Sequence, residues 1–311
     1  MSAALPQVFP HAGLPARVTV YEVGARDGLQ NEKATVPTAV KAQFIDRLAE
    51  AGATVVEATS FVHPKWVPQL ADAEDLFTGL RRRDGVRYPV LVPNPRGYER
   101  ALACGAREIA VFASATETFA RRNLNTSVEG ALAEIEAVVA RARAAGLWVR
   151  GYVSMCFGDP WQGPVDPAAV AAVVERLLSA GCQEISLGDT IGTATPGHVR
   201  ALIDTLGSRG VDPARLAVHF HDTYGQALAN TLAALLAGIT TVDASAGGLG
   251  GCPFAKSATG NLATEDLVWM LDGLGVYTGI DLPALVETSR WMAGHLGRPA
   301  PSRAVQALTK D

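Results

Sequence analysis

The chain has 311 residues, of which 48% are hydrophobic and 19% charged, so it can bury a large core and is not an intrinsically disordered protein. Its formal net charge of −4 excludes general nucleic-acid binding, and no uninterrupted apolar segment is long enough to span a bilayer. The start of the chain lacks the pattern of a secretory signal and the four cysteines form no Cys-x-x-Cys pair, so we expect a cytoplasmic protein that binds neither nucleic acid nor membrane.

Short runs rich in β-branched residues recur along the chain and predict eight strands: Arg17–Val23, Thr54–Ala58, Tyr88–Val92, Glu108–Ala113, Trp148–Val153, Glu184–Leu187, Leu216–Phe220 and Thr241–Ala244. The segments between them carry apolar residues at helical spacing, as Val40, Phe44 and Leu48 do, and several end on a glycine. Eight strand–helix units predict an α/β fold, the (β/α)8 TIM barrel. A doubly wound open sheet is the alternative, but no Gly-rich dinucleotide turn follows the first run.

No linker rich in Ser, Gly or Pro divides the chain, so we expect residues 1–311 to form a single catalytic barrel domain. Residues 1–16 would form an N-terminal arm. Residues 281–311 would form additional C-terminal helices that pack on the barrel.

Two histidines, His219 and His221, lie two residues apart in the seventh predicted strand. Because strand side chains alternate between faces, both imidazoles point the same way and form half of a metal site. Asp27, after the first strand, and Asn261, after the last, are plausible oxygen ligands. Such a set suits Mg²⁺ or Mn²⁺ better than structural Zn²⁺, which favours thiolates. The alternative interpretation is a pair of buried, hydrogen-bonded histidines.

Further polar residues follow strand ends, which is where the sites of such barrels lie. Arg26 follows the first strand, Glu57 lies near the end of the second, and Asp189 follows the sixth. Arg26 adds a permanent positive charge beside the metal, and together they could stabilise an enolate while a carbon–carbon bond breaks or forms. Asp189 could instead cap its own loop.

A glycine-rich segment, residues 247–252, follows the eighth strand with the sequence Gly-Gly-Leu-Gly-Gly-Cys. It lacks the G-x-G-x-x-G order, so it indicates a bendable backbone rather than a phosphate cradle. Its Cys252 could act as an acid or a base beside the metal, although a single cysteine is more often inert.

The most specific motifs of the chain are six segments at the predicted strand ends: Glu22–Lys33, Glu57–Val62, Glu184–Gly192, His219–Ala227, Gly248–Ala255 and Ala258–Glu265. Together they closely resemble the 3-hydroxy-3-methylglutaryl-CoA lyases, a branch of the metal-dependent lyase and synthase barrels. The glycine-rich loop with its cysteine is specific to the lyase branch. The Arg-Asp and His-x-His motifs alone would fit the synthases too.

The resemblance implies a role for each candidate residue. Arg26 would hold the thioester carbonyl and stabilise the enolate, Cys252 would protonate that enolate, and Gln30 would support the geometry between metal and substrate. The implied metal ligands are Asp27, His219, His221 and Asn261. The residues implied to complete the site are Glu57, Asp189 and Tyr152. At the rim of the site, Ser60 and Asn123 would contact the CoA moiety.

The implied reaction is the divalent-metal-dependent, retro-Claisen cleavage of 3-hydroxy-3-methylglutaryl-CoA to acetyl-CoA and acetoacetate. A base, His219 or Asp27, would remove the proton of the tertiary hydroxyl. The alternatives are a lyase for a longer 3-hydroxyglutaryl-CoA analogue, a Claisen-type acyl-CoA synthase, and a non-catalytic binding barrel with a structural metal. Because similar barrels often form dimers, we expect a homodimer that binds a small-molecule CoA thioester.

Overall fold

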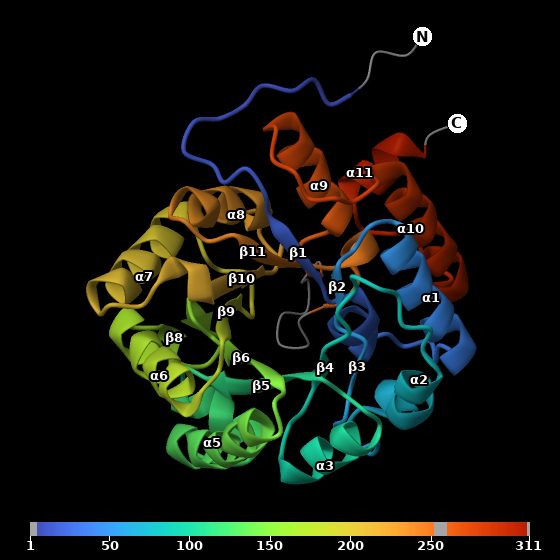
Figure 1. The fold of residues 1–311 in the computed structure, drawn as a ribbon. Helices are drawn as coiled ribbons and strands as arrows, with labels where there is room; N and C mark the ends of the chain where they lie inside the picture. Colours follow the sequence, from blue (N-terminus) through green and yellow to red (C-terminus); the bar gives the residue numbers. More distant parts are fainter. Residues whose placement is uncertain (1–4, 252–259, 310–311) are drawn as a thin grey trace.

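A sheet of parallel strands curls round the axis of the molecule, and helices cover its outer side (Figure 1). The structure is a computed structural model that describes residues 5–251 and 260–309. Within these residues the strand order is β2-β1-β11-β10-β9-β6-β5-β4-β3. The bounds of these strands are β1 Thr19–Glu22, β2 Val55–Val56, β3 Thr59–Ser60, β4 Val90–Leu91, β5 Glu108–Ser114, β6 Trp148–Ser154, β9 Glu184–Asp189, β10 Leu216–Phe220 and β11 Thr241–Ala244.

The second strand of the barrel is split into β2 and β3 on either side of Glu57 and Ala58. This split strand lies between β1 and β4, because Glu57 donates its backbone N–H to the Glu22 carbonyl and Ala58 donates to the Pro89 carbonyl, both over 2.9 Å. The sheet therefore closes on itself with eight strand positions in the described part of the chain. The predicted (β/α)8 barrel is confirmed, every predicted run overlaps a strand, and the open-sheet alternative is wrong.

Helices alternate with the strands because the segments between them are amphipathic. Helix α1 buries Phe44, Ile45 and Leu48 in the core, and the side chains of Asn94 and Asp166 cap the starts of α3 and α6 by accepting a backbone N–H. No helix in the described ranges is long and apolar enough to cross a membrane. The bounds are α1 Thr38–Glu50, α2 Ala73–Gly79, α3 Pro95–Ala103, α4 Glu117–Phe119, α5 Val128–Ala144, α6 Pro167–Ala180, α7 Pro196–Ser208, α8 Ala227–Leu236, α9 Thr264–Gly273, α10 Leu282–Leu296 and α11 Arg303–Leu308.

Helices α10 and α11 come after the eighth strand–helix unit and lie beside α9 and α1 (Figure 1), which confirms the additional C-terminal helices. The remaining elements are short. They are a hairpin of β7 Gly158–Asp159 and β8 Gly163–Pro164, and single turns η1 Gly24–Gly28, η2 Pro68–Leu70, η3 Ala120–Leu124, η4 Pro213–Arg215 and η5 Ala246–Gly248.

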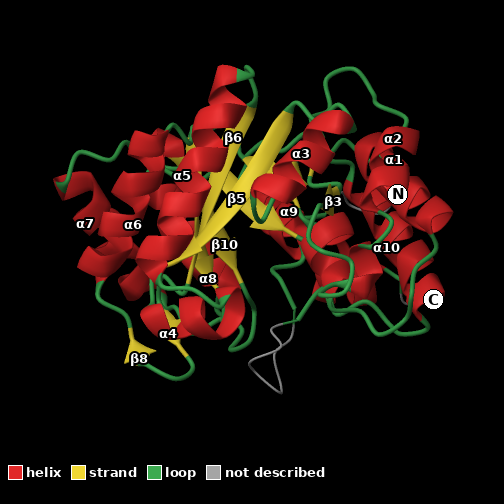
Figure 2. Cartoon of the chain, turned by 90° about the horizontal axis from the view of Figure 1, so that it is seen from below, coloured by secondary structure: helices red, strands yellow, loops and turns green. Residues whose placement is uncertain are grey.

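Alternation along the strands separates the apolar core from a polar barrel interior. In β10, Val218 and Phe220 belong to the hydrophobic core between sheet and helices, whereas His219 lies on the opposite face. Arg150 of β6 and Asp243 of β11 meet inside the barrel, where their side chains form an ion pair of 2.6 Å. Figure 2 shows the strands enclosed between helices on both sides.

Two glycines that end helices allow a test of how the end of α1 packs against the segment before α10. Gly146, after α5, has φ +76° with open space where a Cβ would lie, whereas Gly52, after α1, has φ +98° and a Cβ there would lie 2.2 Å from the Gly279 carbonyl oxygen. Gly146→Ala should lower the free energy of unfolding by about 1–2 kcal/mol, the cost of a left-handed backbone. Gly52→Ala should lower it clearly more, because the 279 backbone must also move. Urea unfolding curves of both variants measure the difference, and equal losses would contradict this packing.

Candidate active site

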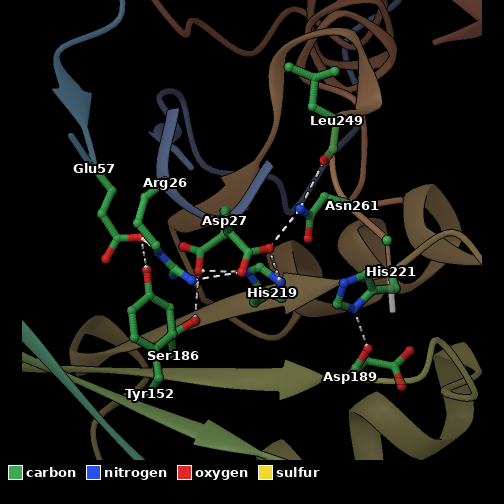
Figure 3. A network of polar contacts seen from close by, with 12 residues as sticks. Arg26, Asp27, Glu57, Tyr152, Ser186, Asp189, His219, His221, Leu249 and Asn261 are labelled. Carbon is green, nitrogen blue, oxygen red and sulfur yellow. Dashed lines mark hydrogen bonds and ion pairs between the residues drawn. The ribbon is translucent and has the colours of Figure 1, made fainter. Parts of the chain in front are cut away.

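Asp27, His219, His221 and Asn261 meet at the carboxyl ends of the strands (Figure 3). Asp27 lies in the turn η1 after β1, and His221 directly follows β10 and pairs with Asn261 in an isolated β-bridge. The ligand atoms of Asp27, His219 and His221 all lie within 4.8 Å of one another. The Asn261 amide donates to Asp27 Oδ2 over 2.8 Å. The four predicted metal ligands, drawn from opposite ends of the chain, therefore share one space.

Both imidazoles are hydrogen-bonded through Nδ1. His219 Nδ1 lies 3.2 Å from Asp243 Oδ2, and His221 Nδ1 lies 3.0 Å from the Asp189 carbonyl oxygen. Because both partners can only accept, each Nδ1 carries a hydrogen, so the Nε2 of each neutral imidazole has a lone pair for a metal. Burial, and then the neighbouring His219, lower the pKa of His221 to about 4, so this imidazole is neutral at physiological pH. The histidines are thus buried and hydrogen-bonded, and also oriented as ligands.

The amide of Asn261 is oriented so that its oxygen is free for a cation. Its nitrogen donates to Asp27 Oδ2 and, over 3.0 Å, to the Leu249 carbonyl (Figure 3). Its Oδ1 is buried and accepts no hydrogen bond from any described residue. A buried unpaired acceptor is costly unless a ligand satisfies it. Two imidazole nitrogens, a carboxylate and this amide oxygen fit a divalent cation such as Mg²⁺ or Mn²⁺.

Arg26 lies beside this set and joins two carboxylates. Its Nε donates to Glu57 Oε2 over 2.6 Å and its Nη1 donates to Asp27 Oδ1 over 2.7 Å. Burial raises the pKa of Asp27, but Arg26, the two histidines and the Asn261 amide outweigh it and hold the pKa at about 2. Asp27 is therefore ionised and can bind a cation at any physiological pH.

Glu57 and Tyr152 hold the guanidinium of Arg26 from the side away from Asp27. Glu57 comes from the gap between β2 and β3 and is fully buried, and the Tyr152 hydroxyl donates to Glu57 Oε2 over 3.2 Å. The guanidinium carbon lies 5.4 Å from the centre of the Tyr152 ring. The break in the second strand thus places a carboxylate where it orients Arg26.

A cavity of about 270 Å³ opens over these residues. Its apolar wall is formed by Leu91, Phe112 and Phe119. A larger cavity of about 430 Å³ lies between α8, α9 and α11, and of the candidate residues with described positions it meets only Asn261, so the smaller cavity is the candidate active site. The predicted residues that line the smaller cavity are Arg26, Asp27, Gln30, Asn123, Tyr152, His219 and His221.

Asp189 and Ser60 use their side chains to hold their own loops. The Asp189 carboxylate accepts from the backbone N–H of Thr193 and Ala194, over 2.9 and 3.1 Å. Burial raises the pKa of Asp189 to about 6 despite these bonds. Ser60 Oγ accepts from Val62 N over 3.2 Å and is almost fully buried. Asp189 therefore meets the site through its backbone carbonyl, which orients His221.

Comparisons with known proteins agree with this geometry. The HMGL-like family model matches residues 17–292. The chain belongs to the HMGL-like family. It is 54% identical to the mitochondrial hydroxymethylglutaryl-CoA lyase of Rattus norvegicus over 297 residues, which cover 96% of this chain and 91% of the rat protein. The mitochondrial hydroxymethylglutaryl-CoA lyase of Homo sapiens is 50% identical with the same coverage.

Solved structures of the HMGL-like family share the fold closely. The hydroxymethylglutaryl-CoA lyase of Pseudomonas aeruginosa superposes with a TM-score of 0.93 at 50% identity, covering 95% of this chain and 98% of that one. An HMG-CoA lyase from Acinetobacter baumannii in complex with coenzyme A and 3-methylmalate gives a TM-score of 0.90 at 38% identity, covering 96% and 97%. The resemblance inferred from the motifs is confirmed.

Cys252, which the sequence motifs implicate as a proton donor in the HMGL-like family, lies outside the described residues. The described residue before it, Gly251, lines the candidate cavity. The Asn31 side chain donates to the Gly251 carbonyl over 3.2 Å. The segment that leads to Cys252 therefore approaches the site.

Buried charged residues that the sequence analysis missed hold the segments that carry the site residues. Glu22 Oε1 accepts from Gly24 N over 2.8 Å and Ala246 N over 2.9 Å, and its Oε2 accepts from Thr264 Oγ1 over 2.6 Å. This one carboxylate joins the turn that carries Asp27 to the segments on either side of the glycine-rich loop. Arg150 and Asp243 were missed as well, and an inward-facing charge in an otherwise apolar strand was the signal that could have found all three.

The buried carboxylates of Glu22 and Glu265 predict that the stability of the fold depends on pH. Burial is the main cause that raises the pKa of Glu22 to about 7 and that of Glu265 to about 8, above the ordinary value near 4.5. A folded-state pKa above the unfolded one contributes stability that is complete below the unfolded pKa and is lost as the pH rises through the folded pKa. The free energy of unfolding should therefore fall between about pH 5 and pH 8.

Glu265→Gln should flatten this fall by on the order of 1–3 kcal/mol, because its amide oxygen can still accept from Gly247 while carrying no titrating proton. Urea unfolding at a series of pH values measures the slope. The exposed substitution Glu287→Gln serves as the control and should follow the wild type. Parallel curves for all three proteins would show that Glu265 does not titrate in this range.

Proposed function

We propose that the chain is an enzyme that cleaves 3-hydroxy-3-methylglutaryl-CoA to acetyl-CoA and acetoacetate with the help of Mg²⁺ or Mn²⁺. The observation that supports this most strongly is the set of Asp27, His219, His221 and Asn261 next to Arg26 in one cavity. Relatives that are about 50% identical in sequence are named hydroxymethylglutaryl-CoA lyases, and the solved structure of one relative is a complex with coenzyme A. The substrate is therefore a CoA thioester.

The proposed metal ligands are Asp27, His219, His221 and Asn261. When bound there, a divalent cation supplies Lewis acidity that lowers the pKa of a substrate hydroxyl. His219 would have no lone pair left for a proton, because its Nε2 would bind the cation and its Nδ1–H is bonded to Asp243, so of the two candidate bases Asp27 takes the hydroxyl proton. The bond between C2 and C3 then breaks, and its electron pair passes to the thioester as an enolate.

Arg26 binds the thioester oxygen and stabilises the enolate by its fixed positive charge. Glu57 and Tyr152 keep the guanidinium in place, so little reorganisation is needed as charge develops. Gln30 and Asn123 line the same cavity and contact the substrate, whereas Ser60 does not line it. Asp189 positions His221 through its carbonyl. On the family resemblance, Cys252 returns a proton to the enolate and completes acetyl-CoA.

The substrate range and the assembly remain part of the proposal. A lyase for a longer 3-hydroxyglutaryl-CoA analogue and a Claisen-type synthase use the same carbonyl and metal chemistry, so incubation with a panel of CoA thioesters separates them. Release of acetoacetate that depends on added Mg²⁺ or Mn²⁺ supports the lyase, and product formation only in the condensing direction would overturn it. A single catalytic domain over residues 1–311, a homodimer and a cytoplasmic location stay predictions from the sequence.

Removal of the amide ligand should weaken metal binding without unfolding the chain. For metal-free wild type, Mn²⁺ at about 100 times its Kd should stabilise the fold by about 2.7 kcal/mol, seen as a rise in Tm. Asn261→Ala should lose most of that rise. Asn230→Ala is the matched control, because Asn230 is also buried and its Oδ1 is also unpaired among the described residues, but it lies in α8. If both variants keep the full rise, Asn261 is not a ligand.

Loss of the guanidinium should affect turnover more than metal binding. Arg26→Gln should keep the Mn²⁺-dependent rise in Tm while kcat falls by about 100- to 1,000-fold, the usual cost of an oxyanion donor. Arg26→Lys keeps the charge but not the planar fork that binds both Glu57 and Asp27. Its kcat should therefore lie between that of the wild type and that of Arg26→Gln. Steady-state acetoacetate release gives kcat, and a near-normal value for Arg26→Gln would overturn the role.

A further inference from the structure

Asp243 joins the proposed metal site to a buried cation in the centre of the barrel. It lies on β11 with a relative exposure of 1%, and its Oδ2 is 3.2 Å from His219 Nδ1 and 2.9 Å from Ser186 Oγ. Its Oδ1 accepts from Arg150 Nη2 over 2.6 Å, and both side chains of this pair are fully buried. The carboxylate thus bonds to the imidazole on one side and to a permanent positive charge on the other.

The two histidines of the site are supported in different ways. His221 donates its Nδ1–H to a neutral backbone carbonyl, that of Asp189, whereas His219 donates to an ionised carboxylate. A carboxylate that accepts the N–H of a metal-binding imidazole fixes its tautomer and ring orientation and makes the other nitrogen a stronger ligand. The His219 and His221 ring centres are 5.2 Å apart with an interplanar angle of 69°, so a rotation of His219 would misdirect its Nε2.

We propose that Asp243, held by Arg150, is a positioning residue that directs His219 Nε2 at the cation and thereby sets the affinity of this protein for its divalent metal. The inference rests on the proposed metal site. It adds a residue that binds neither metal nor substrate, and it places the control of metal affinity in the barrel interior rather than among the ligands.

Arg150 explains why Asp243 can stay ionised without solvent. An unpaired buried carboxylate would be strongly destabilising, and a buried ion pair offsets this cost only with good geometry and further hydrogen bonds. The Arg150 guanidinium carbon lies 3.8 Å from the Tyr21 ring centre, its Nη1 donates to the Tyr152 hydroxyl over 3.0 Å, and its Nε lies 2.9 Å from Glu184 Oε1. A guanidinium held at so many points keeps Asp243, and through it His219, in one position.

A purely structural ion pair that only fills the barrel is the competing explanation, and metal affinity separates the two. Titration of metal-free protein with Mn²⁺, followed by the EPR signal of free Mn²⁺, gives the Kd directly. Asp243→Asn should weaken binding by about 10- to 100-fold, the usual effect of losing such a partner. At saturating Mn²⁺ its KM for the thioester should stay near the wild-type value. Ser186→Ala removes another bond to the same carboxylate and should leave the Kd within about twofold.

Folding must be controlled for, because Asp243→Asn removes the fully buried partner of Arg150 and leaves this guanidinium paired with Glu184 alone. The double variant Arg150→Gln/Asp243→Asn removes both charges, so it should recover stability while its Mn²⁺ affinity stays low. In addition, NMR of the metal-free wild type labelled with ¹⁵N-histidine, recorded at a pH where His219 is neutral, should find it as the Nδ1–H tautomer.

Three results would contradict either the proposed metal site or the role proposed for Asp243. If the wild type binds no Mn²⁺, the proposed metal site itself is wrong. If the wild type binds but Asp243→Asn, or the double variant where the single one does not fold, binds within about threefold of it, Asp243 does not set the affinity. An Nε2–H tautomer of His219 would overturn the proposed orientation directly.

Discussion

The pairing of β1 with β11 is the constraint on which the site depends. The register runs from Thr19 opposite Thr241 to Glu22 opposite Ala244, so the first and last strands of the barrel end side by side. Only this closure brings Asp27 within 2.8 Å of the Asn261 amide, across more than two hundred residues of chain. Glu22 strengthens the same junction, because its carboxylate accepts hydrogen bonds from the turn after β1 and from both sides of the glycine-rich segment.

Inside the closed barrel, charge is balanced by direct contact. Arg26 joins Asp27 and Glu57, and Arg150 joins Asp243 and Glu184, so each buried guanidinium holds two carboxylates. Removing one partner of such a buried pair typically costs about 3–5 kcal/mol, because the other charge is left uncompensated. The Tyr152 hydroxyl connects the two clusters by hydrogen bonds with Arg150 and Glu57. The position of each reactive group is therefore determined by its neighbours, which favours electrostatic preorganisation.

The cavity adds an apolar side to this polar arrangement. Leu91, Phe112 and Phe119 face the cavity that Arg26 and the histidines line. Apolar walls lower the local dielectric constant, which strengthens the interaction between Arg26 and a developing enolate. A site with strong fixed charges on one side and hydrocarbon on the other suits the cleavage of a carbon–carbon bond next to a thioester.

The sequence by itself determined the features that depend on local periodicity. Eight β-branched runs separated by amphipathic segments were enough to predict the barrel, and strand alternation alone placed His219 and His221 on one face. The residues at the strand ends were predictable for the same reason, because parallel strands in a barrel all point their carboxyl ends at one opening.

The tertiary structure alone decided which of these residues touch one another. It directed the Asp189 carboxylate into its own loop, split the second strand at Glu57, and paired Asp243 with Arg150 and His219. Side chains such as Glu22, Arg150 and Asp243 carry no local signal of their partners, because those partners lie on strands that become neighbours only when the barrel closes. Periodicity along the chain reports the face of a residue, whereas its hydrogen-bond partner is set by the three-dimensional register of the strands.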